Sequence, residues 1–266
     1  MTLLNITDGP IRTEVRGRVL EVTIDRPKAN AIDAATSRVM GEVFSAFRDD
    51  DTLRAAILTA TGERFFCPGW DLKAAAEGES ADADYGLGGF GGLQELPGLN
   101  KPVVCAVNGL AFGGGFEIMI SCDIIIAAEH ATFALPEIRS GVIADAATIK
   151  LPRRIPYHVA MEMLLTGRVV DCTEARHWGF VNEVVPADQL MARAREVADK
   201  LAGGPPLVYA AIKEVLERTH HLNDKEALAL LNRRGLPSIS KLYASEDQLE
   251  GAKAFAEKRD PVWKGR

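Results

Sequence analysis

Two glutamates stand in apolar surroundings where a carboxyl group is suited to proton transfer. Glu117 follows the glycines of GLAFGGGFEIMISCDI, and Glu137 lies twenty residues later in FALPEIRSG. Burying an unpaired charge costs several kcal/mol, so a carboxylate here needs a partner, a raised pKa or an outward orientation. This spacing lets a pair of strands return the second carboxylate to the cavity of the first. Two partly desolvated carboxylates, one holding a proton, can move protons to and from a substrate. Alternatively, each caps or ion-pairs at the end of an element.

Three consecutive glycines, Gly113 to Gly115, precede Glu117 and indicate a site formed by the backbone. If a helix begins near Gly114, its first N–H groups lack intrahelical partners and lie at the positive end of the helix dipole. Because glycine has no Cβ, a ligand oxygen can approach these amides closely. Such an amide stabilises a developing oxyanion, and losing one donor typically costs about 3–4 kcal/mol in the transition state. A tight turn that needs positive φ is the alternative.

Strands alternating with helices must position these residues. Apolar alternation and buried runs predict strands in residues 18–27, 54–62, 101–109, 123–130 and 131–137. Apolar residues at helical spacing predict helices in residues 34–50, 157–167, 187–203, 206–221 and 224–235. Such alternation indicates an α/β fold with largely parallel strands. We expect an α/β core in residues 1–200 and a helical C-terminal region in residues 201–266.

The composition predicts a soluble, cytoplasmic protein. The chain of 266 residues has a net charge of −6, so no global field attracts nucleic acid or an anionic membrane. No stretch approaches the ~20 apolar residues of a membrane span, and the first residues lack the pattern of a secretion signal. The four cysteines have no CxxC spacing, and no cluster has metal-ligand spacing. We therefore expect reduced thiols and no metal site.

The segment 77–94, EGESADADYGLGGFGGLQ, is acidic and then rich in glycine. Its GLGGFG matches the G-x-G-x-x-G pattern of dinucleotide-binding loops. The residues before it do not form a strand, so the context that gives the pattern its meaning is absent. We expect this segment to be a mobile loop rather than a packed element.

Four stretches together resemble the crotonase (enoyl-CoA hydratase/isomerase) superfamily. They are DRPKANAID, FFCPGWDLK, NGLAFGGGFE and FALPEIRSGV, and their order and spacing agree with that superfamily over essentially the whole chain. The resemblance implies a crotonase-like spiral of ββα units that ends in helices forming a homotrimer or a dimer of trimers. It also implies an acyl-CoA thioester as substrate, with coenzyme A as the substrate carrier and no metal or redox cofactor.

The resemblance assigns the chemistry to four positions. The backbone N–H groups of Trp70 and Gly114 would form an oxyanion hole for the thioester oxygen, while Glu117 and Glu137 would handle water and the α-proton. These roles make chemical sense, because loss of the α-proton places negative charge on the carbonyl oxygen. Two aimed amides stabilise that charge while one carboxylate holds water and the other relays a proton.

The resemblance also assigns coenzyme A contacts. Lys28 and Ala29 would border the adenine, and Lys73 would lie near a phosphate of coenzyme A. Phe255 and Lys258 occupy positions from which a neighbouring subunit would cover the nucleotide.

Four stretches narrow the resemblance to hydratases of crotonobetainyl-CoA, whose acyl group ends in a trimethylammonium. They are RPKANAIDA, GWDLKAAAEGE, AFGGGFE and AFAEKRDPVWKGR. A quaternary ammonium suits aromatic faces, each worth about 0.5–2 kcal/mol. The acyl-pocket candidates near the site are Trp70, Tyr85, Phe90 and Phe116. Aromatic residues that only pack are the alternative.

The stretch GVIADAATIKLP after Glu137 departs from the superfamily pattern. Ala144 replaces a proline, and Ala146, Ala147 and Thr148 stand where glycines are common. Their side chains are expected to narrow the pocket and to restrict the approach of a ligand to the backbone. Two alternatives therefore stay open: a hydratase or isomerase for another short acyl-CoA, and a catalytically weak acyl-CoA-binding protein.

Overall fold

The computed structural model describes residues 3–266, and a mixed main sheet forms its centre. Its strand order is β1-β2-β3-β5-β7-β10, with an antiparallel β1–β2 pair and parallel pairing across the rest. The strands are β1 (Ile11–Arg16), β2 (Val19–Ile24), β3 (Ala55–Ala60), β5 (Val103–Val107), β7 (Ile124–Ala128) and β10 (Glu183–Val185). The strands predicted in residues 18–27, 54–62, 101–109 and 123–130 are confirmed as β2, β3, β5 and β7.

A second, smaller sheet has the strand order β4-β6-β8-β9. Its strands are β4 (Phe65–Cys67), β6 (Leu110–Phe112), β8 (Thr132–Ala134) and β9 (Val170–Asp171). The chain passes from β3 to β4, from β5 to β6 and from β7 to β8, and a helix follows each pair. This repeat is the predicted spiral of ββα units, which places the ends of β6 and β8 side by side.

The main sheet is buried on both faces because its side chains alternate between two cores. On β3, Ala56 and Leu58 join the large core that includes the second sheet, whereas Ala55 and Ile57 face the opposite core. Helix α7 (Leu190–Gly203) covers that opposite face. Its buried residues are Leu190, Ala194, Ala198 and Ala202. The small alanine side chains let the helix axis approach the sheet closely.

Among residues 3–266, six further α-helices precede α7, and all but the second bury side chains in the large core. They are α1 (Ala34–Asp49), α2 (Leu72–Ala76), α3 (Gly114–Met119), α4 (Asp145–Lys150), α5 (Tyr157–Thr166) and α6 (Cys172–Trp178). Arg26 fixes the start of two of them. It forms ion pairs with Asp33, which caps α1, and with Asp71, which caps α2. The loop after β2 and the loop after β4 are thereby held together.

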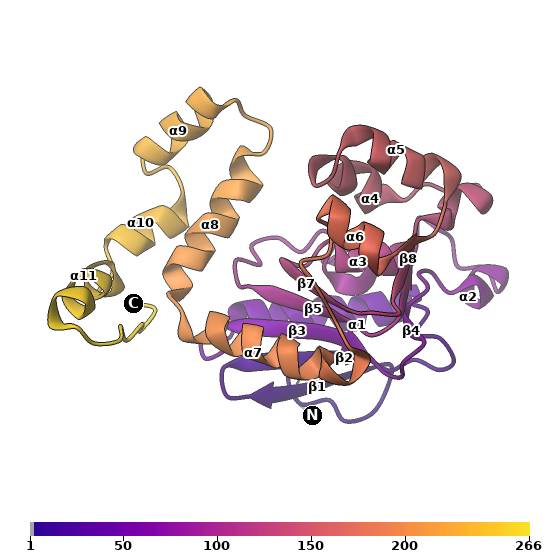
Figure 1. Ribbon diagram of the computed structural model, residues 1–266, viewed down its shortest axis with the longest axis horizontal. Coiled ribbons are helices and arrows are strands. Elements are labelled where there is room, and N and C mark those ends of the chain that lie inside the picture. The colour runs from indigo at the N-terminus through magenta and orange to yellow at the C-terminus, as the bar shows by residue number, and fades with distance from the viewer. Residues whose placement is uncertain (1–2) are drawn as a thin grey trace.

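Beyond α7 the chain consists of helices that extend away from the sheets (Figure 1). They are α8 (Pro206–Thr219), α9 (Asp224–Asn232), α10 (Pro237–Tyr243) and α11 (Asp247–Glu257). Large apolar side chains are exposed on them, namely Ile212, Leu216, Leu228, Leu249 and Phe255. Among the described residues, no helix is long and apolar enough to cross a membrane. The subunit assembly and the division near residue 200 stay predictions.

The glycine-rich segment 86–94 is a packed element, so the expectation of a mobile loop is wrong for this part of the chain. Gly88, Gly89, Gly91 and Gly92 are buried, and Phe90–Gly92 forms a short 3₁₀ helix, η1. Helix α1 packs against η1. Glycine in isolation favours flexibility, but here its small size permits close contact between backbones.

Candidate active site

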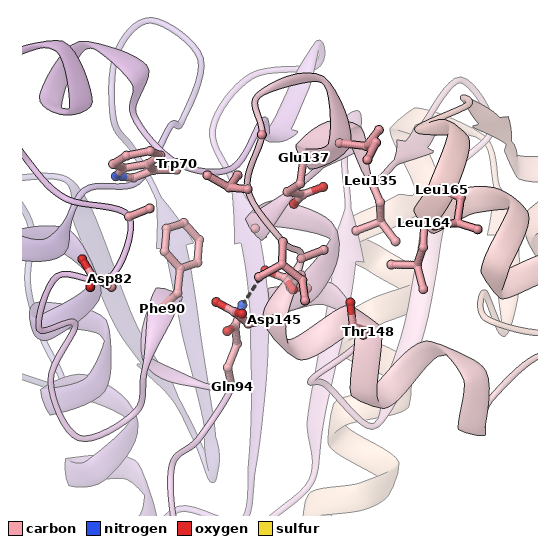
Figure 2. Close-up of a pocket in the computed structure, with 18 of the residues that line it drawn as sticks. Trp70, Asp82, Phe90, Gln94, Leu135, Glu137, Asp145, Thr148, Leu164 and Leu165 are labelled. Carbon is pink, nitrogen blue, oxygen red and sulfur yellow. Dashed lines mark hydrogen bonds between the residues drawn. The ribbon is translucent and has the colours of Figure 1, made fainter.

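One cavity contains both predicted catalytic glutamates. It has a volume of about 1080 Å³. Four segments of the chain line it: the Trp70 loop, the segment 81–94, the start of α3, and the chain from Leu135 through α5. Glu117, Glu137, Trp70 and Gly114 all line it. Figure 2 shows Trp70 and Phe90 on one side of the cavity, with Leu164 and Leu165 on the other. The spacing of the two glutamates therefore predicted a shared cavity correctly.

Glu117 is held at both carboxylate oxygens. Its side chain leaves α3 one turn after the helix begins, and the residue is 6% exposed. Oε1 accepts the backbone N–H of Ala147 at 2.8 Å, and Oε2 accepts the side-chain amide of Gln94 at 3.3 Å. Burial raises the pKa of Glu117, while these two hydrogen bonds oppose that rise. Because both donors stabilise the ionised form, Glu117 is the member of the pair whose negative charge is held by hydrogen bonds.

Glu137 is desolvated without comparable support. It lies in the short 3₁₀ helix η2 (Pro136–Arg139) directly after β8. Its Oε2 is buried and has no hydrogen-bond partner within residues 3–266. Burial raises its pKa to about 7, with smaller contributions from the charges of Glu117 and Asp145. Glu137 is therefore the member of the pair suited to hold a proton near neutral pH.

The predicted helix start is confirmed, because α3 begins at Gly114. Gly113 caps the helix with φ 54°, so the alternative of a turn with positive φ also holds, one residue earlier. The backbone before Trp70 packs directly against the start of α3, since a Cβ on Gly69 would lie only 2.8 Å from the Gly114 nitrogen. In the part of the chain that is described, the amides of Trp70 and Gly114 donate to no protein acceptor.

Close contacts explain the glycines on either side of the helix start. A Cβ on Gly114 would lie 2.3 Å from the ring of Phe90, and one on Gly115 would lie 2.0 Å from the carbonyl oxygen of Cys67. A Cβ on Gly113 would lie 3.0 Å from Glu137 Oε1, which places that carboxylate beside the helix start. The glycines thus bring the amides and the second carboxylate to one edge of the cavity.

Three of the four aromatic acyl-pocket candidates line the cavity, and the fourth does not. Trp70, Tyr85 and Phe90 line it, and Tyr85 packs edge-on against Phe90 with ring centroids 5.3 Å apart. Phe116 lies on α3 and is fully buried, with its ring centroid 5.5 Å from that of Phe180. Placing Phe116 in the acyl pocket was therefore wrong. Successive residues on a helix point about 100° apart, so Phe116 faces the core while Glu117 faces the cavity.

The candidate coenzyme A residues lie outside the cavity lining, and all are exposed except Ala29, which is half-buried. Lys28 and Ala29 are in the loop after β2, and Lys73 is on α2. Phe255 is 87% exposed at the end of α11, and Lys258 is the exposed C-cap of that helix. All five assignments remain predictions.

The unusual stretch after Glu137 supplies a backbone donor to the site and part of the cavity lining. Ala144 caps α4, and the N–H of Ala147 in its first turn reaches Glu117. Asp145 and Thr148 line the cavity, so part of the stretch does shape the pocket as expected. The Ala147 amide is itself taken by Glu117, and the expected restriction on the approach of a ligand to this backbone stays a prediction.

Two cavity features were missed in the sequence. Gln94 contacts Glu117, and its only signal was its place at the end of the glycine-rich segment. Asp82 and Asp145 add two carboxyl groups to the two glutamates (Figure 2). Among the described residues that line the cavity, none is lysine, arginine or histidine. The cavity is therefore electrostatically negative and favours a cation.

Comparisons with known proteins agree with this fold and site. Residues 14–266 match the family model described as Enoyl-CoA hydratase/isomerase. The fold, with its two sheets and terminal helices, is the crotonase fold. The chain belongs to the enoyl-CoA hydratase/isomerase family.

Particular relatives have a narrower description. Carnitinyl-CoA dehydratase from Proteus mirabilis is 55% identical over 252 residues, which cover 94% of this chain and 97% of that protein. Carnitinyl-CoA dehydratase from Escherichia coli is 53% identical over 251 residues, covering 94% and 96%. The crystal structure of enoyl-CoA hydratase from Mycobacterium tuberculosis superposes with a TM-score of 0.88 at 34% identity, covering 97% of this chain and 100% of that one.

Proposed function

We propose that this chain is a lyase that interconverts crotonobetainyl-CoA and carnitinyl-CoA by adding or removing water. The relatives named carnitinyl-CoA dehydratase, at 53–55% identity, support this substrate. The observation that carries the proposal is the cavity itself, which combines two catalytic carboxyl groups with further carboxylates and aromatic rings.

In the hydration direction, the two glutamates divide the proton transfers. The ionised Glu117 takes a proton from water as the water oxygen bonds to the β-carbon of the enoyl thioester. The electron pair of the double bond moves onto the thioester oxygen, where the amides of Trp70 and Gly114 stabilise it. Glu137 then gives its proton to the α-carbon. The proton on Glu117 returns to Glu137 through solvent, which restores the starting state, and dehydration follows the same steps in reverse.

Recognition of the acyl group rests on charge and on aromatic faces. The trimethylammonium has no N–H group, so it binds through electrostatic attraction rather than hydrogen bonds. Tyr85 and Phe90 offer aromatic surface, and Asp82 and Asp145 lie along the same cavity. Each aromatic contact is worth about 0.5–2 kcal/mol. A neutral acyl group of the same shape gains none of this attraction.

A matched pair of substrates tests the proposal. In crotonobetainyl-CoA a trimethylammonium ends the acyl group, and in 5,5-dimethylhex-2-enoyl-CoA a tert-butyl group of the same shape replaces it. We expect a higher kcat/KM for the cationic substrate, and Asp145→Asn should reduce that preference. Asp188→Asn, outside the cavity, is the matched control.

The outcomes separate the candidate functions. Equal kcat/KM for the two substrates, with no effect of Asp145→Asn on their ratio, would refute cation recognition. Turnover of the neutral substrate alone would favour a hydratase for another short enoyl-CoA. Binding of both thioesters without any turnover would identify an acyl-CoA-binding protein.

The remaining assignments belong to the same proposal. Lys28, Ala29 and Lys73 would contact coenzyme A on the chain that holds the substrate, and Phe255 and Lys258 would do so from a neighbouring chain. The exposed apolar side chains of α8, α9 and α11 support a homotrimer or a dimer of trimers, because such side chains favour burial against another surface. We further propose a cytoplasmic location.

A further inference from the structure

We propose that the glycine-rich segment 86–94 is a rigid positioning element of the active site, and that Gln94 is the positioning residue through which it holds Glu117. The inference rests on the proposed function only in assigning Glu117 as the base that accepts a proton from water. It gives a purpose to a segment whose sequence pattern indicated neither nucleotide binding nor catalysis.

The segment is wedged between two helices by contacts that only glycine permits. A Cβ on Gly92 would lie 2.3 Å from the backbone nitrogen of Gly41 on α1. A Cβ on Gly91 would lie 2.2 Å from the side chain of Ile118 on α3. The Gly91 N–H also donates to Ser37 Oγ at 3.1 Å. Any side chain on Gly91 or Gly92 would therefore clash, and the backbone of the segment packs directly against α1 and α3.

Gln94, where the segment ends, is fixed through both its side chain and its backbone. Its side-chain amide donates to Glu117 Oε2 at 3.3 Å, as the dashed line in Figure 2 marks. Its backbone carbonyl accepts a hydrogen bond from the ammonium of Lys150 at 2.9 Å, and Lys150 also donates to Ser121 Oγ at 2.7 Å. The Ser121 hydroxyl in turn donates to the Glu117 carbonyl at 2.7 Å. Lys150 thus ties Gln94 and the backbone of Glu117 together.

Two donors from different segments of the chain hold the carboxylate of Glu117. Ala147 on α4 binds Oε1, and Gln94 on the glycine-rich segment binds Oε2. The charged or titratable groups facing Glu117 are Asp145 and Lys150, the first and last residues of α4, and Glu137 across the cavity. An amide N–H can donate to a carboxylate but gains nothing comparable from the protonated acid, so Gln94 favours the ionised form.

Two variants of nearly equal size separate this role from a general effect on folding. Gln94→Leu removes the donor, and Gln94→Glu places an acceptor against the carboxylate. For Gln94→Leu we expect kcat to fall about tenfold with little change in KM, as for the loss of one hydrogen bond to a charged group. The acidic limb of the pH profile of kcat/KM should move to higher pH. Gln94→Glu should shift that limb further, because two carboxyl groups would then compete for one proton.

The control is Gln189→Leu, because Gln189 is exposed and does not line the cavity. An acidic limb that stays at the wild-type position in both Gln94 variants would overturn the proposal, and so would a rise in KM with unchanged kcat. If Gln94→Leu does not fold, the shift in Gln94→Glu decides the question. The assay uses whichever enoyl thioester the wild-type protein turns over best. A wrong acyl group would therefore appear in the wild-type substrate comparison, and a wrong role for Gln94 only in these variants.

Discussion

The backbone N–H of Ala147, in the first turn of α4, donates a 2.8 Å hydrogen bond to the side chain of Glu117, the fourth residue of α3. A backbone donor cannot be lost by substitution of its own side chain, so alanine serves at this position as well as glycine would. The departure of residues 144–148 from the family pattern therefore leaves the support of Glu117 in place.

Replacing Gly114 by alanine should abolish most turnover. The added methyl group would lie 2.3 Å from the Phe90 ring, so either the ring or the start of α3 must move. Displacing one oxyanion donor typically lowers kcat by about 10²–10³. Steady-state kinetics would measure this loss. Gly203→Ala is the control, because a Cβ there meets nothing within 4 Å. Equal kcat for Gly114→Ala and the wild type would contradict the oxyanion assignment.

The raised pKa of Glu137 predicts how stability depends on pH. Its pKa rises from 4.5 to about 7 on folding, so the native state binds more protons than the unfolded state between these values. This carboxyl therefore lowers stability as pH increases from about 4.5 through about 7. Glu137→Gln removes the effect and should raise Tm relative to wild type at pH 8 but not at pH 4.5.

Thermal unfolding at both pH values, followed by circular dichroism, measures this difference. Glu129→Gln, at an exposed position, provides the control for removal of a carboxylate. The same Tm difference for Glu137→Gln at both pH values would show that the Glu137 pKa is not raised.

Substitutions should divide the aromatic residues into those that determine substrate preference and those that only stabilise the fold. Tyr85→Leu and Phe90→Leu should reduce the preference for crotonobetainyl-CoA over its tert-butyl analogue by roughly 2- to 30-fold, corresponding to about 0.5–2 kcal/mol. Phe116→Leu should lower stability and leave the preference unchanged, because Phe116 is buried against Phe180. Ratios of kcat/KM for the two substrates provide the measurement. A change of preference in Phe116→Leu alone would reverse this assignment.

Arg26 should contribute to the stability of the fold. Arg26→Met leaves Asp33 and Asp71 without their shared partner, and we expect a loss of about 1.5–3 kcal/mol in the free energy of unfolding. Arg12→Met removes a more exposed ion pair with Asp25 and should cost about 0–1 kcal/mol. Urea unfolding of the two variants measures both values. Similar losses for both would show that the caps of α1 and α2 do not depend on Arg26.

Several parts of the site could be predicted from the sequence because their signals are local. The glycines before Glu117 indicated a helix start, and α3 begins at Gly114. The spacing of Glu117 and Glu137 matched a return through β7 and β8 to the same cavity. Alternating apolar residues likewise predicted the main strands, because one local period determines which face each side chain occupies.

Other parts depend on partners distant in the chain. The glycines of segment 86–94 indicate flexibility in isolation, and their packing role appears only when Gly41 and Ile118 are placed against them. The orientation of Phe116 depends on which side of a short helix faces the core. Gln94 and Ala147 reach Glu117 from segments 23 and 30 residues away, so no local pattern could reveal them.

The most direct test of the account is the product formed from crotonobetainyl-CoA, analysed by mass spectrometry for the wild type, Glu117→Gln and Glu137→Gln. We predict that the wild type adds one water to give carnitinyl-CoA, and that each variant does so about 10²–10⁴ times more slowly while still binding the thioester. An unchanged thioester with the wild type, or wild-type rates in either variant, would contradict the account.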